Sequence, residues 1–213
     1  MILSEAATTL WDTAKALALQ AAPVSPSARP ALPPLLFFTD PDRTPEPWRT
    51  AENLPRGAGV VFRAFAAEDA VEQGLKLRAA CDRAGVVLLA GRDVELAGAI
   101  NADGLHLPER LLGRAGSVRV DHPDWLVTGA VHQAENWRLA KSLDAAIVSP
   151  VFPAGGASAA KAVLGLGGFQ ALTEQAPCPV YALGGISAGN AHSLLQTRAC
   201  GFAAVDAITA AFG

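Results

Sequence analysis

Short apolar runs recur from residue 35 to the C-terminal end of the sequence, spaced roughly twenty residues apart. They span 35–39, 58–63, 86–90, 104–107, 126–131, 146–150, 180–183 and 203–207. Runs that are apolar throughout are typical of parallel strands, which are buried on both faces. Most of the segments between them, such as 69–84 and 134–143, can form helices. Eight strand–helix units predict an α/β fold, a (β/α)8 TIM barrel.

An open, doubly wound sheet is the alternative arrangement of such units. That fold usually carries a glycine-rich turn after its first strand. Here the run 35–39 leads through Asp40 into Pro41-Asp42-Arg43, so the barrel is preferred. Because barrel enzymes bind their ligands where the strands end, candidate site residues are sought at those positions.

The N-terminal 34 residues have a different pattern. Leu10, Ala14 and Leu17 share one face of a helix predicted over residues 8–22, and a proline-rich linker follows to Pro34. We therefore divide the chain into residues 1–34, an extra helix with its linker, and residues 35–213, the barrel. The helix is expected to cover the bottom of the barrel; the alternative is a flexible tail.

Composition and charge exclude several classes of partner. A net charge of -3 without a basic run argues against nucleic acid. No stretch reaches the ~18 apolar residues of a membrane span, and no secretory signal is recognisable. The scattered Cys81, Cys178 and Cys200 predict buried thiols rather than disulfides. We expect a cytoplasmic protein whose partner is a small molecule.

A pair of glycines follows the run 180–183. Gly184 and Gly185 leave backbone N–H groups unshielded, and a helix predicted to begin near Ser187 would add its positive end, so the loop suits a phosphate. The run 203–207 ends beside this loop, where barrels commonly hold phosphate. The alternative is a tight turn that needs positive φ.

Several segments resemble the thiamine phosphate synthase and TenI superfamily, in the family's order. They are Leu36-Phe37-Phe38-Thr39-Asp40, Val60-Val61-Phe62-Arg63, Asn101-Ala102-Asp103-Gly104-Leu105-His106-Leu107, Ser149-Pro150-Val151-Phe152-Pro153 and Gly184-Gly185-Ile186. The resemblance runs from about residue 35 to the C-terminal end. It implies the same (β/α)8 barrel, and a homodimer, since the family often forms dimers.

The synthase branch of this family joins a pyrimidine diphosphate to a thiazole phosphate with magnesium, and its metal ligands are missing here. The family's Asn-Asp pair aligns with Gly91-Arg92, and its second aspartate aligns near Leu111. Asp93 and Glu109 are the nearest carboxylates, a poor set for magnesium. The family's lysine two positions after Arg63 is Phe65. We therefore expect no metal site and no cofactor.

The family's phosphate-binding positions are also altered. In the loop 154–161, only Ser158 and Lys161 could hold a diphosphate. The family's serine at the end of the eighth strand aligns with Asp206, whose carboxylate would repel a phosphate. Asp206 could instead cap the last helix through its side chain.

His132, which follows the run 126–131, matches the histidine implicated in tautomerisation by the TenI branch. An imidazole titrates near neutral pH and can transfer a proton without a metal. The alternative is an ordinary polar residue at the start of a loop.

Arg63 is a cation at a strand end, suited to a carboxylate or phosphate. Its alternative role is an ion pair with Glu68 or Asp93. His106 lies within a strand, where it either binds substrate or is a buried structural histidine; its direction is not fixed by the sequence.

The resulting hypothesis is a TenI-like barrel that binds a thiazole phosphate or a similar phosphate or carboxylate anion. His132 is its catalytic residue if it is a metal-independent thiazole tautomerase. The alternatives are a thiamine phosphate synthase and a non-catalytic ligand-sensing or regulatory barrel. The predicted ligand-binding residues are Arg63, His106, Ser149, Ser158, Lys161, Gly184, Gly185 and Asp206.

Overall fold

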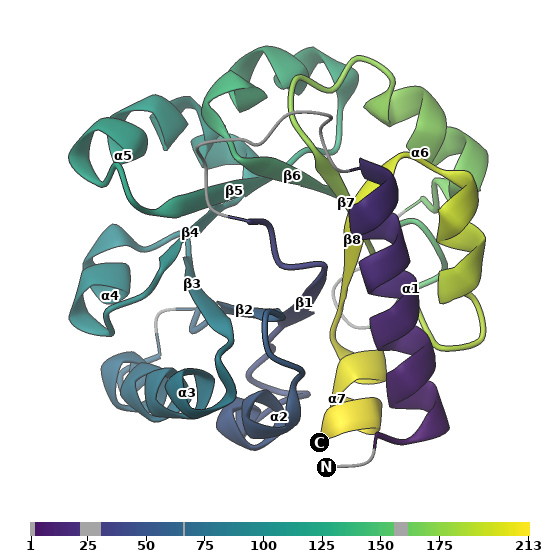
Figure 1. The fold of residues 1–213 in the computed structure, drawn as a ribbon. Helices are drawn as coiled ribbons and strands as arrows, with labels where there is room; N and C mark the ends of the chain where they lie inside the picture. The colour runs from purple at the N-terminus through teal and green to yellow at the C-terminus, as the bar shows by residue number, and fades with distance from the viewer. Residues whose placement is uncertain (1–2, 22–30, 66, 156–161) are drawn as a thin grey trace.

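A computed structural model describes residues 3–21, 31–65, 67–155 and 162–213 of the chain. Eight parallel strands form a closed barrel in chain order, with β8 pairing back onto β1 (Figure 1). The strands are β1 Leu35–Phe38, β2 Gly59–Phe62, β3 Val87–Gly91, β4 Gly104–Leu107, β5 Leu126–Ala130, β6 Ala145–Val148, β7 Val180–Leu183 and β8 Ala199–Ala204. The predicted (β/α)8 barrel is confirmed.

Seven of the strands lie within about two residues of the predicted runs, but β8 begins earlier than predicted. It starts at Ala199 instead of residue 203, because Cys200 and Gly201 hide the start of the apolar run. Ala203 of β8 pairs with Leu36 of β1, which closes the barrel. This closure brings the first and last segments of the barrel together.

Helices surround the strands on the outside of the barrel (Figure 1). They are α1 Glu5–Ala21, α2 Pro47–Asn53, α3 Ala70–Ala84, α4 Val94–Ala99, η1 Glu109–Arg114, α5 Ala115–Asp121, η2 Ala134–Ser142, α6 Gly165–Thr173, η4 Ala191–Gln196 and α7 Asp206–Phe212, where η marks a 3₁₀ helix. The predicted helix 69–84 is α3, whereas 134–143 forms the 3₁₀ helix η2.

The helix expected near Ser187 does not begin there. A turn occupies residues 188–190, and the 3₁₀ helix η4 starts at Ala191. The amide of Asn190 explains the difference: its Oδ1 accepts from Ser187 N at 2.8 Å and its Nδ2 donates to Gly185 O at 2.8 Å. These bonds hold the chain in a loop, so the described segment 184–190 has no α-helix that begins next to the glycine pair.

The N-terminal helix α1 lies along the outer side of β8, not across the bottom of the barrel as predicted (Figure 1). Leu10, Ala14 and Leu17 are buried in one cluster with Phe202 on the outer face of β8. The elements next to β8, η4 and α7, are short, so α1 supplies the apolar cover that they leave incomplete. The alternative of a flexible tail is also wrong for residues 5–21.

The core has two layers. One lies between strands and helices; the other fills the barrel with side chains such as Leu36, Leu89, Ile147 and Tyr181. The thiol of Cys81 is buried, and burial raises its pKa to about 12, as expected of an unreactive apolar group. Among the described residues, no helix is long and apolar enough to span a membrane.

Candidate functional site

A cavity of about 420 Å³ opens where several barrel strands end. It brings together five of the predicted ligand-binding residues, Arg63, Ser149, Gly184, Gly185 and Asp206, from segments far apart in the sequence. Two further residues that the sequence analysis did not single out, Phe38 and Arg43, also line it. The predicted Ser158 and Lys161 lie outside the described residues.

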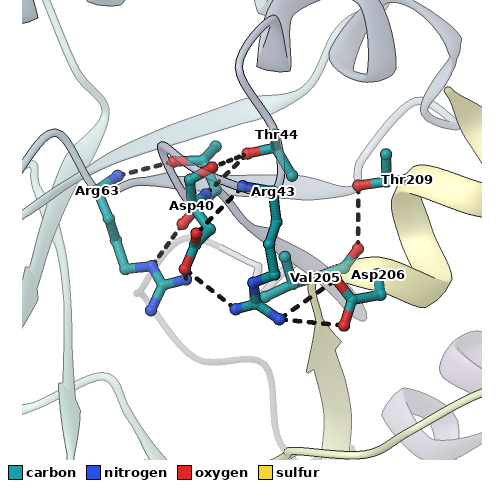
Figure 2. A network of polar contacts seen from close by, with 8 residues as sticks. Asp40, Arg43, Thr44, Arg63, Val205, Asp206 and Thr209 are labelled. Atoms are coloured by element: carbon teal, nitrogen blue, oxygen red, sulfur yellow. Dashed lines mark hydrogen bonds and ion pairs between the residues drawn. The ribbon is translucent and has the colours of Figure 1, made fainter. Parts of the chain in front are cut away.

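Arg43 bridges two carboxylates at this cavity (Figure 2). Its Nη1 donates to both carboxylate oxygens of Asp206, at 3.2 and 3.0 Å, and its Nη2 donates to Oδ2 of Asp40 at 3.1 Å. Arg43 follows β1 and Asp206 follows β8, so the closing strand pair brings them together. The sequence did contain one indication of this pair: Asp206 replaces the family's serine, and a carboxylate at that position is stabilised by a nearby cation such as Arg43.

Asp40 begins a tight turn that fixes the direction of Arg43. Its backbone N donates to Oγ1 of Thr44 at 2.7 Å, and this hydroxyl donates back to Asp40 O at 2.9 Å (Figure 2). Burial alone would raise the pKa of Asp40, but the hydrogen bonds and charges of Arg43 and Arg63 outweigh it and hold the pKa below its usual value. Asp40 is therefore an ionised anchor for both arginines.

Arg63 is held on several sides. Its Nη2 donates to Oδ2 of Asp40 at 3.3 Å, and its Nε donates to the carbonyl of Thr39. The guanidinium lies over the rings of Phe38 and Phe65, 5.6 and 5.4 Å from their centroids. Burial lowers the pKa of Arg63 although Asp40 raises it, yet an arginine remains protonated at neutral pH.

The alternative of an ion pair between Arg63 and Glu68 or Asp93 is wrong. The carboxylate that Arg63 meets is Asp40, because β1 and β2 are neighbours in the barrel and both strands end at the same level. The Arg63 side chain is only 25% exposed and still reaches the cavity.

Asp206 does not cap the last helix as suggested. It is the first residue of α7, and the cap position, Val205, makes no side-chain hydrogen bond to the helix. The Asp206 side chain is 66% exposed and pairs with Arg43, whose charge attracts the carboxylate more strongly than a backbone N–H group would. Arg43 also offsets the negative charge that was expected to repel a phosphate.

The glycine pair adopts a backbone that other residues rarely take. The φ angles are +101° at Gly184 and +64° at Gly185. A Cβ at Gly184 would lie 2.8 Å from Cα of Pro150, and one at Gly185 would overlap the carbonyl oxygen of Pro153. The pair therefore allows the loop after β6 to pass close by, the tight-turn role considered from the sequence. Within the described residues, the two glycine N–H groups have no hydrogen-bond partner.

His132 lies two residues beyond the end of β5. Its Nδ1 lies 3.1 Å from the carbonyl oxygen of Ser149, which itself lines the cavity. A carbonyl only accepts hydrogen bonds, so Nδ1 carries the proton and Nε2 of the neutral ring carries a lone pair. No described residue hydrogen-bonds to Nε2, and the side chain is solvent-exposed.

His106 points into the barrel, which settles its direction. It is buried, its Nδ1 lies 3.0 Å from Oγ1 of Thr128, and its ring meets Phe38 edge-on at 5.1 Å. Burial first, and then the charges of Arg63 and His132, lower the pKa of His106 to about 3. His106 is therefore a neutral residue beneath the cavity, in contact with its wall through Phe38.

The two carboxylates nearest the family's metal position do not fit magnesium. Oδ1 of Asp93 accepts from Leu96 N at 2.9 Å and caps α4. Oε1 of Glu109 accepts from His132 N and from Asn136 Nδ2, each at 2.8 Å. Across the described part of the chain, no three acidic, histidine or cysteine side chains gather as metal ligands.

Comparison with known proteins places this architecture in a family. The family model described as thiamine monophosphate synthase matches residues 40–208. A thiamine-phosphate synthase of Bacillus thuringiensis is 30% identical over 178 residues, covering 79% of this chain and 81% of that protein. One of Chloroflexus aurantiacus is 32% identical over 142 residues, covering 66% of each chain.

A solved structure agrees with the sequence relatives. Thiamine phosphate pyrophosphorylase from Pyrococcus furiosus superposes with a TM-score of 0.70 at 25% identity, covering 84% of this chain and 91% of that chain. The matched residues 40–208 include most of the cavity lining, and Arg43, Arg63 and Asp206 are among them. This chain therefore belongs to the thiamine monophosphate synthase (TMP-TENI) family.

Proposed function

We propose that this protein binds a thiazole phosphate, or a similar small anion, in the cavity and isomerises it by proton transfer through His132. One observation carries the proposal: Nδ1 of His132 contacts the carbonyl of Ser149, a residue that lines the cavity, and this contact leaves Nε2 available as a base. A tautomerisation removes a proton at one atom and adds one at another, so an imidazole that accepts and returns a proton is sufficient.

The charges around the cavity support an anionic ligand. Arg43 and Arg63 supply two cations, and the N–H groups of Gly184 and Gly185 add donors on the same cavity. Asp40 and Asp206 balance the arginines, so the group is neutral overall before a ligand binds. A ligand with a single phosphate or carboxylate suits this balance better than a diphosphate does.

Thiamine phosphate synthesis is the second candidate, and the names of the relatives favour it. In the resembling family that reaction uses magnesium and a diphosphate. The contacts of Asp93 and Glu109 oppose such a metal site, and Phe65 stands where the family has a lysine. Proton transfer without a metal needs none of these groups, so we place it first.

The decisive experiment follows the isomerisation of a thiazole carboxylate phosphate by NMR. The wild type is expected to accelerate conversion equally with and without EDTA. His132→Ala should lose that acceleration and bind inorganic phosphate within about twofold of wild type, because the proposed phosphate contacts come from Arg43, Arg63 and the glycine pair. His192→Ala is the matched control, since His192 is exposed on η4.

Two results would overturn the proposal. Pyrophosphate release from the pyrimidine diphosphate and the thiazole phosphate with magnesium would establish the synthase. If wild-type protein binds the thiazole phosphate yet leaves the isomerisation rate unchanged, a non-catalytic ligand-binding barrel replaces the enzyme.

A further inference from the structure

We infer that Arg43 is a specificity-determining residue for the ligand's phosphate, and that Asp206 occupies its binding end until the phosphate takes over. The inference rests on the proposed anion site and adds a residue and an exchange to it. It predicts that a phosphate monoester binds by replacing one carboxylate on one guanidinium group.

The two ends of the Arg43 guanidinium have unequal partners. Nη2 donates to Asp40, whose side chain is 18% exposed and whose carboxylate also accepts from Arg63. Nη1 is tied to Asp206 alone, and that side chain is 66% exposed. Asp40 therefore anchors the arginine, and Nη1 is the end that can exchange its partner.

Asp206 has little to hold it in place apart from Arg43. It does not cap α7, and no other described side chain bonds to its carboxylate. An exposed ion pair between such groups is weak, so solvent or a competing anion can separate them at small cost. The carboxylate can then turn into water while α7 stays folded.

The exchangeable end lines the anion cavity. Arg43, Arg63 and Asp206 line the same space as Gly184 and Gly185. Arg63 is less able to change partners, because Asp40, the carbonyl of Thr39 and two aromatic rings hold it. Arg43 is therefore the cation that can add a new bidentate contact when an anion enters.

This arrangement selects for charge on the ligand. Two oxygens of a phosphate monoester can replace the two carboxylate oxygens that Nη1 now meets. An uncharged alcohol cannot compensate for the loss of Asp206. The dephosphorylated alcohol should therefore bind much more weakly than its phosphate ester, whichever ring the ligand carries.

A double-mutant cycle tests the exchange, with inorganic phosphate as the probe and calorimetry as the readout. Asp206→Asn frees Arg43 and should tighten phosphate binding about fivefold. Arg43→Gln should weaken it about tenfold or more. In the Arg43→Gln background, Asp206→Asn should tighten phosphate binding clearly less than it does with Arg43 present, because it then relieves charge repulsion but no longer removes a competitor for Nη1.

Two variants serve as controls. Asp12→Asn removes an exposed carboxylate of similar charge, paired with Lys15 on α1, and should leave phosphate affinity unchanged. Arg43→Lys keeps the charge without the planar fork and should bind phosphate between wild type and Arg43→Gln. Thermal melting checks that each variant is folded.

The exchange is wrong if Asp206→Asn weakens phosphate binding or leaves it unchanged. It is also wrong if Asp206→Asn tightens binding equally with and without Arg43, since that result would reflect general charge only. Failure of the proposed isomerisation is seen separately, because that assay follows product formation and depends on His132 whereas this one follows binding.

Discussion

Oε1 of Glu109 accepts a 2.8 Å hydrogen bond from the backbone N–H of His132, which ties the turn after β4 to the loop after β5. The same oxygen accepts from Asn136 Nδ2 at 2.8 Å and from Gln133 N at 3.3 Å. Burial would raise the pKa of Glu109, but these hydrogen bonds and the charge of His132 outweigh it and lower the pKa. Glu109 thus positions the proposed base without contacting its ring.

Replacing Glu109 by Ala should remove this support. We expect a loss of about 1–3 kcal/mol in the free energy of unfolding and a lower kcat for isomerisation, with KM nearly unchanged. The stability and kcat of Glu109→Gln should lie between those of wild type and Glu109→Ala, because the amide oxygen of glutamine can still accept these hydrogen bonds. Glu135→Ala, an exposed glutamate on η2, is the control. Urea denaturation and initial rates measure both effects; a normal kcat in Glu109→Ala would show that the contact does not position His132.

The buried His106 should make stability depend on pH. Its pKa is near 6.5 in the unfolded chain and about 3 when folded, so the unfolded state binds more protons between these values. Its contribution is complete above about pH 6.5 and is lost as pH falls, by up to about 1.4 kcal/mol per pH unit.

His106→Asn should abolish that slope while keeping a polar group near Thr128. Urea midpoints between pH 7 and 5 measure the difference, and His122→Asn serves as a control because His122 is half-buried beside Trp125 rather than inside the barrel. Equal slopes for wild type and His106→Asn would mean that His106 does not resist protonation.

Two glycines with nearly the same φ separate strain from crowding. Gly185 has φ +64° and its Cβ would overlap Pro153 O, whereas Gly165 has φ +63° and no neighbour within 4 Å of the added atom. Gly165→Ala should cost about 1 kcal/mol from backbone strain alone. Gly185→Ala should cost more than about 3 kcal/mol and weaken phosphate binding. Similar thermal shifts in the two variants would contradict the close approach of the loop after β6.

Tyr181 links the barrel interior to the segment before β1. Its hydroxyl donates to Pro33 O at 2.6 Å, and burial raises its pKa well above 10. It is the sole tyrosine of the chain, so tyrosinate absorbance should be absent from the folded protein at pH 11 and appear on unfolding. A raised pKa gives stability that is complete below about pH 10 and is lost at higher pH.

Tyr181→Phe should lower the free energy of unfolding at pH 7 by about 1–2 kcal/mol, because the buried carbonyl of Pro33 loses its donor. Chemical denaturation measures the change. A higher free energy of unfolding in Tyr181→Phe would contradict this, because it would mean that burying the hydroxyl destabilises the folded protein.

The strand pattern was predictable from the sequence because strands buried on both faces need apolar residues at nearly every position. The start of β8 was not, since Cys200 and Gly201 are small residues that fit strands and loops alike. The position of α1 also escaped prediction: an amphipathic pattern gives the buried face but not the surface that it meets.

The candidate site was predictable only at positions that match family motifs. Arg43 and Asp206 are 163 residues apart, and the sequence around one does not indicate that the other lies nearby. Only the closed barrel makes β1 and β8 neighbours. The side-chain direction of His106 likewise depends on which alternate residues of β4 face inward, and a four-residue strand offers too few positions to decide this from hydrophobicity.

The pairing of β1 with β8 also has a consequence for synthesis on the ribosome. A nascent chain emerges N-terminal end first, at about 5–20 residues per second, so Arg43 leaves the ribosome on the order of ten seconds or more before Asp206. Before β8 has been synthesised, one edge of β1 has no partner strand, and the apolar face of α1 has no β8 to pack against. We therefore expect a chaperone that binds exposed apolar segments of nascent chains to bind this protein at α1 and β1 before β8 has been synthesised.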